Sequence, residues 1–139
     1  MRAGFTTIEL LVVLAVSAVL AGISLPAMLG MRDRLTVRLA AADAARAVAD
    51  ARTVALTAAR RTAVRIDARA NTLTVYAGTD TVRTLHLDEY GVHLRTTRDS
   101  IAFGPTGIGW GAATATITIT RGSASTALAI SRIGRIRRT

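Results

Sequence analysis

An uncharged apolar segment near the start of the chain constrains its fold more than any other feature. Residues 10–31 contain no charged side chain and consist mainly of Leu, Val, Ile and Ala. As a helix, this segment would extend about 33 Å at about 1.5 Å per residue. That length matches a bilayer core of about 30 Å, so the segment predicts a membrane-spanning helix.

An acidic side chain, Glu9, lies directly before residues 10–31, in the first turn of the predicted helix. An ionised group at the centre of a membrane helix costs about 2.5–3.5 kcal/mol on insertion scales. A secretory signal has a shorter apolar stretch of about 7–15 residues, and an ordinary membrane anchor leaves Glu9 unexplained. Since a buried charge is tolerable when paired and costly when alone, we expect Glu9 to have a partner.

Gly4, Phe5 and Glu9 stand at a specific spacing ahead of the apolar residues 10–14. This pattern resembles the processing site and first helix of type IV pilins and type II secretion pseudopilins. The resemblance implies cleavage between Gly4 and Phe5 by a prepilin peptidase on the cytoplasmic side and N-methylation of the new Phe5 amine. It also implies assembly into a filament, in which Glu9 meets the terminal amine of a neighbouring subunit.

The composition bounds the rest of the chain. The part that follows the apolar helix, roughly 105 residues, is enough for one modest core. The absence of cysteine excludes disulfides, thiolate chemistry and cysteine-based metal sites. The net charge of +9 is concentrated at the C-terminus, because no acid follows Asp99 while five arginines do, namely Arg121, Arg132, Arg135, Arg137 and Arg138.

Residues 32–60 continue the helical pattern and become amphipathic. One apolar stripe is predicted at steps of three and four residues, at Val37, Ala41, Ala44, Val48, Ala51, Ala55 and Ala58. Arg46, Asp50, Thr53 and Thr57 fall on the other side, where Asp43 with Arg46 and Arg46 with Asp50 are spaced to pair. The small alanines indicate that a sheet packs closely against this half of the helix.

Beyond Arg61 the period changes from 3.6 to 2, which is typical of strands. Strands are expected at residues 62–67, 72–76, 81–87, 92–97, 101–103, 114–120 and 126–131, with a last short segment at 134–138. The predicted fold is therefore α+β and pilin-like, a long N-terminal helix packed against an antiparallel β head. We expect a leader at residues 1–4, a transmembrane and filament-core helix at 5–31, its amphipathic continuation at 32–60 and the head at 61–139.

The closing region resembles the GspH/FimT family of minor pseudopilins and pilins. The resemblance is carried by residues 103–107, a Thr-rich strand, and residues 130–137. It implies a head of two antiparallel sheets and a structural role in a type II secretion pseudopilus or a type IV pilus, without a cofactor. It further implies a single pass through the bacterial inner membrane, a periplasmic head, and other pilins, a prepilin peptidase and an inner-membrane assembly platform as partners.

An alternative function rests on the C-terminal arginines. Gly134, Arg135 and Arg137 match the Gly-Arg-x-Arg motif of the DNA-uptake branch of this family, and Arg132 and Arg138 extend it. Guanidinium groups without a nearby acid contact phosphates of double-stranded DNA without reading their sequence. The simpler interpretation is a solvated chain end. A third possibility is a membrane anchor with a β head that does not assemble.

Other candidate chemistry is weak. The glycine-rich residues 104–111 lack the Lys-Ser/Thr ending of a phosphate-binding loop, so an ordinary loop is expected. Trp110 is either an exposed stacking platform or, as we expect, a side chain folded back on the sheet. His86 and His93 are interpreted as solvated residues flanking a turn rather than metal ligands. No nucleophile-elbow pattern occurs, and we expect neither enzymatic activity nor a metal site.

Overall fold

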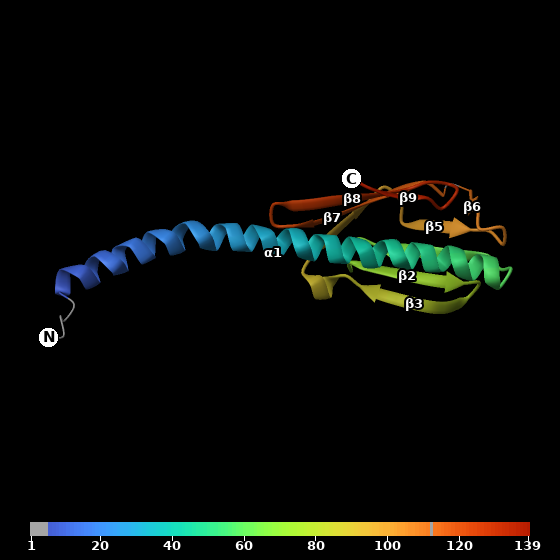
Figure 1. Ribbon diagram of the computed structural model, residues 1–139. Helices are drawn as coiled ribbons and strands as arrows, with labels where there is room; N and C mark the ends of the chain where they lie inside the picture. Colours follow the sequence, from blue (N-terminus) through green and yellow to red (C-terminus); the bar gives the residue numbers. More distant parts are fainter. Residues whose placement is uncertain (1–5, 112) are drawn as a thin grey trace. The chain divides into compact units, whose positions relative to one another are not determined.

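The computed structural model describes residues 6–111 and 113–139. They divide into two compact units, one that ends at Arg32 and one that begins at Asp33. One long helix, α1 (Thr7–Thr57), is followed by a series of strands and one short 3₁₀ turn (Figure 1). The strands are β1 (Thr62–Asp67), β2 (Thr72–Ala77), β3 (Asp80–His86), β4 (His93–Thr96), β5 (Ser100–Phe103), β6 (Gly109–Trp110), β7 (Ala115–Arg121), β8 (Ala124–Ile130) and β9 (Ile136–Arg138). The 3₁₀ turn η1 (Asp88–Tyr90) separates β3 from β4.

The first unit holds the apolar part of α1. Residues 6–29 are all exposed, and Pro26 lies inside the helix. The hydroxyl of Ser24 donates to the carbonyl of Leu20 at 2.8 Å, so this polar side chain is satisfied within the helix. By length and composition, the helix can cross a membrane.

The second unit contains two antiparallel sheets beside the later part of α1 (Figure 1). One sheet has the order β3-β2-β1-β5-β6 and the other has the order β4-β7-β8-β9. The predicted fold class is confirmed, since the chain is α+β with a long N-terminal helix packed against antiparallel sheets. The two-sheet head that the resemblance implied is also present.

Small residues form the contact between α1 and the sheets. The buried side chains of α1 are Val37, Ala40, Ala41, Ala44, Ala47, Val48, Ala51 and Ala55. The prediction for Ala58 is wrong, because α1 ends at Thr57 and Ala58 is exposed. Ala59 adopts a positive φ of 47°, which turns the chain out of the helix. Ala40 and Ala47 widen the predicted stripe.

The core between helix and sheets is filled by large apolar side chains. Phe103 of β5 is 0% exposed and is among the largest of them. The one buried polar side chain among the described residues is Thr62, whose hydroxyl donates to the carbonyl of Ala51 at 2.8 Å. This bond connects the start of β1 to α1. It also gives the Thr62 hydroxyl, which is buried away from water, a hydrogen-bond partner.

Each predicted strand is present, most with slightly different bounds, and β6 is an additional strand that was not predicted. The glycine-rich residues 104–111 were expected to form a loop, but Gly109 and Trp110 pair with Phe103 and Ala102 of β5. Gly109 N also donates to the carbonyl of Arg132 at 2.7 Å. A Cβ at Gly109 would lie 2.2 Å from that of Ala113, so only glycine fits this crossing.

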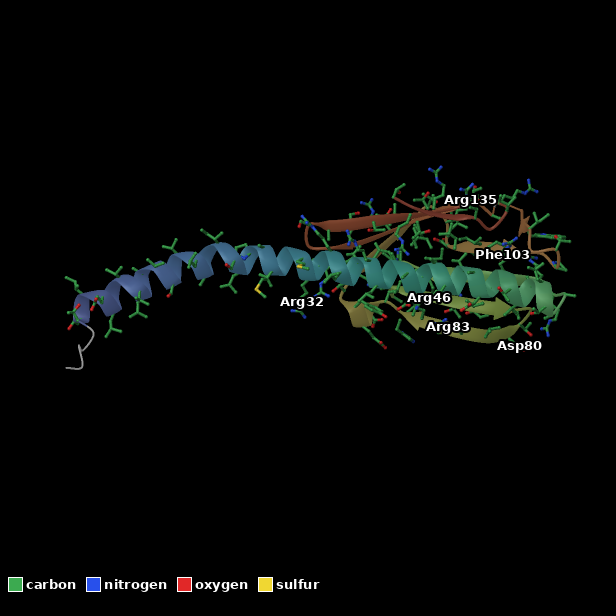
Figure 2. The ribbon with its side chains drawn as sticks, in the orientation of Figure 1. Arg32, Arg46, Asp80, Arg83, Phe103 and Arg135 are labelled. Carbon is green, nitrogen blue, oxygen red and sulfur yellow. The ribbon has the colours of Figure 1, made fainter. Side chains whose placement is uncertain are left out.

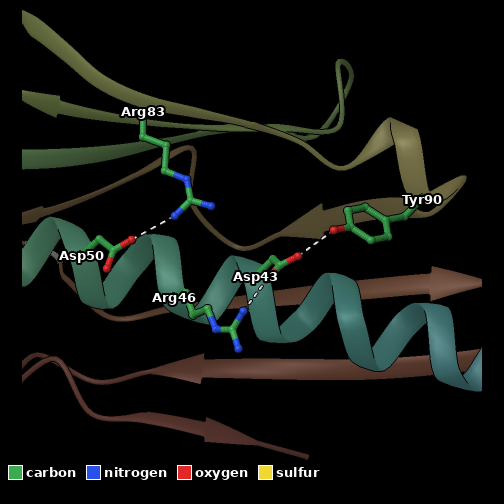
Figure 3. A network of polar contacts seen from close by, with 5 residues as sticks. All are labelled: Asp43, Arg46, Asp50, Arg83 and Tyr90. Atoms are coloured by element: carbon green, nitrogen blue, oxygen red, sulfur yellow. Dashed lines mark hydrogen bonds and ion pairs between the residues drawn. The ribbon is translucent and has the colours of Figure 1, made fainter.

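Polar contacts connect the exposed side of α1 to the head (Figure 3). Arg46 Nη1 lies 3.2 Å from Asp43 Oδ1, which confirms the first predicted pair. The second predicted pair does not form, because Asp50 Oδ2 instead contacts Arg83 Nη1 of β3 at 3.0 Å. The hydroxyl of Tyr90 donates to Asp43 Oδ2 at 2.6 Å, and this bond raises the pKa of Tyr90.

Candidate functional site

Thr6 and Glu9 form a closed set of hydrogen bonds at the start of α1. Glu9 Oε2 accepts from the Thr6 backbone N–H at 2.8 Å and from the Thr6 hydroxyl at 3.0 Å. The Glu9 backbone N–H donates to the Thr6 hydroxyl oxygen at 3.3 Å. This is a capping box, in which two otherwise unpaired helix-end donors are satisfied.

Sequence reasoning missed this role of Thr6, although the pattern of Thr followed three residues later by Glu is a known sign of it. Gly4 and Phe5, the residues of the predicted cleavage and methylation, lie outside the described residues. The predicted meeting of Glu9 with the amine of another subunit therefore stays a prediction. Within a single chain, its carboxylate is held by Thr6.

The apolar part of α1 presents large side chains in every direction around the helix. Each is between 54% and 72% exposed, and they are Ile8, Leu10, Leu11, Val12, Val13, Leu14, Val16, Val19, Leu20, Ile23, Leu25, Met28, Leu29 and Met31. A helix that is hydrophobic all round requires burial in lipid or in a large protein core. This segment is therefore a binding surface for an apolar environment.

A tight turn positions the C-terminal arginines. Gly134 has a φ of +74°, and its N–H donates to the carbonyl of Ser131 at 2.9 Å. A Cβ at Gly134 would lie 2.6 Å from Arg52 Cδ of α1, so the turn rests directly on the helix side chain. Arg52 Nε also donates to the carbonyl of Gly107 at 3.0 Å. Arg52 thus supports both loops at this end of the head.

The predicted basic cluster is exposed but does not lie on one face. Arg132, Arg135, Arg137 and Arg138 are all exposed, and Figure 2 shows Arg135 at the surface near β9. In β9, Arg137 pairs with Ala129 and Arg138 with the buried Leu128. Since neighbouring residues of a strand point to opposite faces, Arg137 lies on the outer face of the sheet and Arg138 on the other.

The four C-terminal arginines have no ion-pair partner among residues 6–111 and 113–139. Their guanidinium groups are therefore available to anions from solution. A set of this kind binds phosphates through charge, without reading a base sequence.

The prediction that Trp110 folds back on the sheet is correct only in part: its ring lies over Gly104, where a Cβ would be 3.3 Å from Trp110 Cε3, but most of the side chain is exposed. It is 59% exposed, and the guanidinium carbon of Arg61 lies 5.8 Å from its ring centroid. The cause is strand alternation, because Gly109 faces the core beside Phe103 and Trp110 faces outward beside Ala102. Trp110 and Arg61 line an open depression of about 520 Å³ that also includes Arg98 and Asp99.

The two histidines lie apart from any metal-type cluster in the described part of the chain. His86 Nδ1 is 3.8 Å from Asp88 Oδ1, and both side chains are more than half exposed. Residues 6–111 and 113–139 contain no group of three or more His, Asp or Glu side chains that could hold a metal ion.

No protein-family model matches the chain, and no curated protein matches it in sequence. Its fold, with a long helix and two antiparallel sheets, is that of the minor pilins and pseudopilins. The type IV minor pilin FimU of Pseudomonas aeruginosa is similar with a TM-score of 0.63 and 18% identity, over 75% of this chain and 88% of FimU. The minor pseudopilin EpsH of the Vibrio cholerae type 2 secretion system is similar with a TM-score of 0.58 and 16% identity, over 74% of this chain and 95% of EpsH.

Proposed function

We propose that the chain is a minor pilin or pseudopilin, a structural subunit of a type II secretion pseudopilus or of a type IV pilus-like filament. The observation that carries this proposal is the apolar part of α1, whose side chains are exposed around the whole helix. Covering each large apolar side chain is worth about 1.5–3 kcal/mol. Lipid supplies that cover before assembly, and the helices of other subunits supply it in the filament.

The proposed route begins with a precursor inserted in the bacterial inner membrane, with its head in the periplasm. A prepilin peptidase cleaves between Gly4 and Phe5, and the Phe5 amine is methylated. An inner-membrane assembly platform then brings the subunit into the filament, where Glu9 pairs with the Phe5 amine of a neighbour. The function of the subunit is structural, in a filament for protein secretion, rather than enzymatic.

Mass spectrometry of the membrane-extracted protein tests the processing step. In cells that hold a prepilin peptidase, we expect a chain that begins at Phe5 and carries one added methyl group. A chain that retains Met1 under these conditions would contradict the proposal.

Filament incorporation tests the role of Glu9. Glu9→Leu is expected to reduce the amount of the subunit in sheared filaments about tenfold or more, because it leaves the buried amine of the neighbour unpaired. Glu89→Leu, the same change at an exposed acid of the head, is the matched control.

Thr6→Ala distinguishes two roles of Glu9, which are capping the helix of its own chain and pairing with the amine of a neighbouring subunit. It removes the capping hydroxyl seen within the chain and leaves the carboxylate in place. If Glu9 serves the neighbouring subunit, this variant still enters filaments. Equal loss with Thr6→Ala and Glu9→Leu would reduce Glu9 to a capping residue. Absence of the original chain from sheared filaments would favour a membrane anchor that does not assemble.

A second candidate function is capture of double-stranded DNA for uptake, favoured by the exposed and unpaired arginines near β9. Gel shifts with the full chain in detergent test it. Arg135→Gln/Arg137→Gln is expected to weaken binding and to reduce the salt slope of log K by about 2, about 0.9 for each lost phosphate contact. Arg69→Gln/Arg95→Gln removes the same charge at two exposed positions of the head and serves as the control. Binding that is indifferent to the change at 135 and 137 would remove this candidate.

A further inference from the structure

A polar pocket lies where the β7–β8 hairpin meets the first packed turns of α1. It has a volume of about 300 Å³, and its polar lining consists of Arg34, Arg38, Ser123, Ser125 and Thr126. No acidic residue lines it. Arg34 and Arg38 are four residues apart on one helix, so their side chains lie on the same face. We refer to this site as the Arg34–Arg38 pocket.

The fold holds the hairpin against the helix at this point. Arg121 Nε of β7 lies 3.0 Å from Asp33 Oδ1, and both side chains are about three-quarters buried. The two-residue hairpin turn begins with Gly122, whose φ is +53°. A Cβ at Gly122 would lie 2.5 Å from Asp33 Oδ2, so the turn approaches the helix as closely as glycine allows.

Because Asp33 pairs with Arg121, its carboxylate does not neutralise the positive charges of Arg34 and Arg38 in the pocket. Neither Arg34 nor Arg38 has an ion-pair or hydrogen-bond partner in the part of the chain that the structure describes. The hydroxyls of Ser123, Ser125 and Thr126 likewise form no hydrogen bond within it. Two exposed guanidinium groups and three free hydroxyls thus converge on one small volume.

This set of donors fits a phosphate group. Guanidinium groups bind phosphate oxygens through charge-assisted and often bidentate hydrogen bonds, and hydroxyls can donate to the remaining oxygens. The pocket has no aromatic side chain on which a base could stack and no acid that would attract a cation. Its chemistry therefore selects a small anion with several acceptor oxygens.

The position of the pocket along the chain suggests the source of that phosphate. Arg34 follows Met31, the last residue of the apolar segment, by three positions, and Arg38 follows it by seven. At about 1.5 Å per residue these steps are about 5 and 10 Å. The headgroup layer on each side of a bilayer core is about 5–8 Å thick. When residues 10–31 span the membrane, Arg34 therefore lies within this layer and Arg38 just beyond it, from where its long side chain can reach back to lipid phosphates.

We propose that the Arg34–Arg38 pocket binds the phosphate of an anionic phospholipid headgroup and thereby holds the base of the head against the membrane surface. The proposal rests on the membrane insertion in the proposed function. It assigns the subunit a lipid ligand that must be released when the subunit leaves the bilayer for a filament.

Native mass spectrometry of the full chain released from detergent micelles tests this site. Micelles are supplemented with equal amounts of phosphatidylglycerol and phosphatidylcholine, and the lipids retained by the protein are counted. We expect selective retention of phosphatidylglycerol. Arg34→Gln/Arg38→Gln is expected to weaken it about 25-fold, from about fivefold for each arginine. Arg69→Gln/Arg95→Gln, which removes the same charge at two exposed positions of the head, is expected to retain phosphatidylglycerol like the original chain.

Equal retention of the two lipids, or undiminished retention by the variant at 34 and 38, would overturn the proposal. Added arms identify the source of the phosphate, since displacement of the lipid by millimolar inorganic phosphate or by a short DNA duplex would overturn the lipid assignment. The measurement does not involve assembly. A failure here leaves the filament role standing, and a chain that never enters filaments can still retain the lipid.

Discussion

The two halves of α1 are both rich in apolar residues, yet they meet opposite surroundings. In the half before Arg32, apolar side chains project on every side and residues 6–29 are exposed. In the half after Asp33, burial is confined to one stripe of small side chains packed under two sheets. The first half depends on an environment outside the chain, while the second obtains its environment from the head.

This difference teaches that side-chain size, and not only hydrophobicity, divides the helix. The packed half uses alanine at most buried positions because the sheets approach closely. The apolar half uses Leu, Val, Ile and Met, which lipid tails accommodate without a fixed shape. The following changes test the contrast by measuring urea unfolding of the head by circular dichroism, with the full chain in detergent.

The largest effect is expected from Phe103→Ala in the core of the head. Removing this fully buried ring lowers the free energy of unfolding by about 3–5 kcal/mol, through lost transfer energy and the cavity left behind. Leu14→Ala, a change of similar kind in the exposed apolar half, should leave the unfolding of the head unchanged. Equal losses from the two variants would break the distinction between the halves.

Replacing a small side chain by a large one should also destabilise the packed half of α1 and leave the apolar half unaffected. Ala44 is 0% exposed, so Ala44→Leu is expected to cost about 1–3 kcal/mol by overpacking. Ala18→Leu in the apolar half is its control, because the Ala18 side chain is exposed. A neutral result for Ala44→Leu would show that the sheets can move away from the helix.

The ion pair at Asp33 tests where the packed half begins. Arg121→Met is expected to lower the free energy of unfolding by about 1–2 kcal/mol, because the mostly buried carboxylate of Asp33 loses its partner. Arg83→Met removes the more exposed pair with Asp50 and should cost under about 0.5 kcal/mol. Similar small losses from both would place the start of the packed half after Asp33.

Ala59 tests where the packed half ends. Its φ of 47° is unfavourable for a residue with a Cβ, so Ala59→Gly is expected to stabilise the head by about 0.5–1 kcal/mol. Ala58→Gly, one residue earlier, is the control and should give no stabilisation. A loss of stability with Ala59→Gly would mean that its side chain contributes contacts that outweigh the backbone cost.

The smallest effect concerns Asp67, in the turn between β1 and β2. The backbone N–H groups of Ala70 and Arg69 donate to its carboxylate and lower its pKa. Its stabilising contribution is therefore present above the unfolded pKa of about 3.9 and is lost as the pH falls through the lower folded value. The advantage of the original chain over Asp67→Asn should be full near pH 6 and should decrease as the pH falls toward pH 3. A constant difference across this range would refute the effect.

Local periodicity was sufficient to predict most of this architecture. The change of period near Arg61 separates helix from strands, and the alternation within residues 62–67 and 114–120 identifies β1 and β7. The error in the partner of Asp50 arises because that contact is long-range. Asp50 pairs with Arg83 instead of Arg46, and Arg83 lies 33 residues from Asp50 in the sequence. Trp110 faces outward only because β6 pairs with β5, which no local pattern indicates.

In the candidate sites, too, some features could be predicted from the local sequence and others depend on how distant segments pack. The exposure of the C-terminal arginines could be predicted from their charge, but their division between the two faces of β9 follows from its register with β8. The Arg34–Arg38 pocket joins two segments about 90 residues apart in sequence. Such a site emerges only once the hairpin is placed beside the helix.

The alanine stripe of α1 has a consequence for how far such chains can diverge. A contact made by small side chains limits the side-chain volume at a few helix positions. It does not require a particular residue on the strand opposite each of them. Strand residues can then be exchanged freely as long as they remain apolar on the inner face. Two proteins can therefore keep one backbone plan while sharing fewer than one residue in five, as this chain and FimU do at 18% identity.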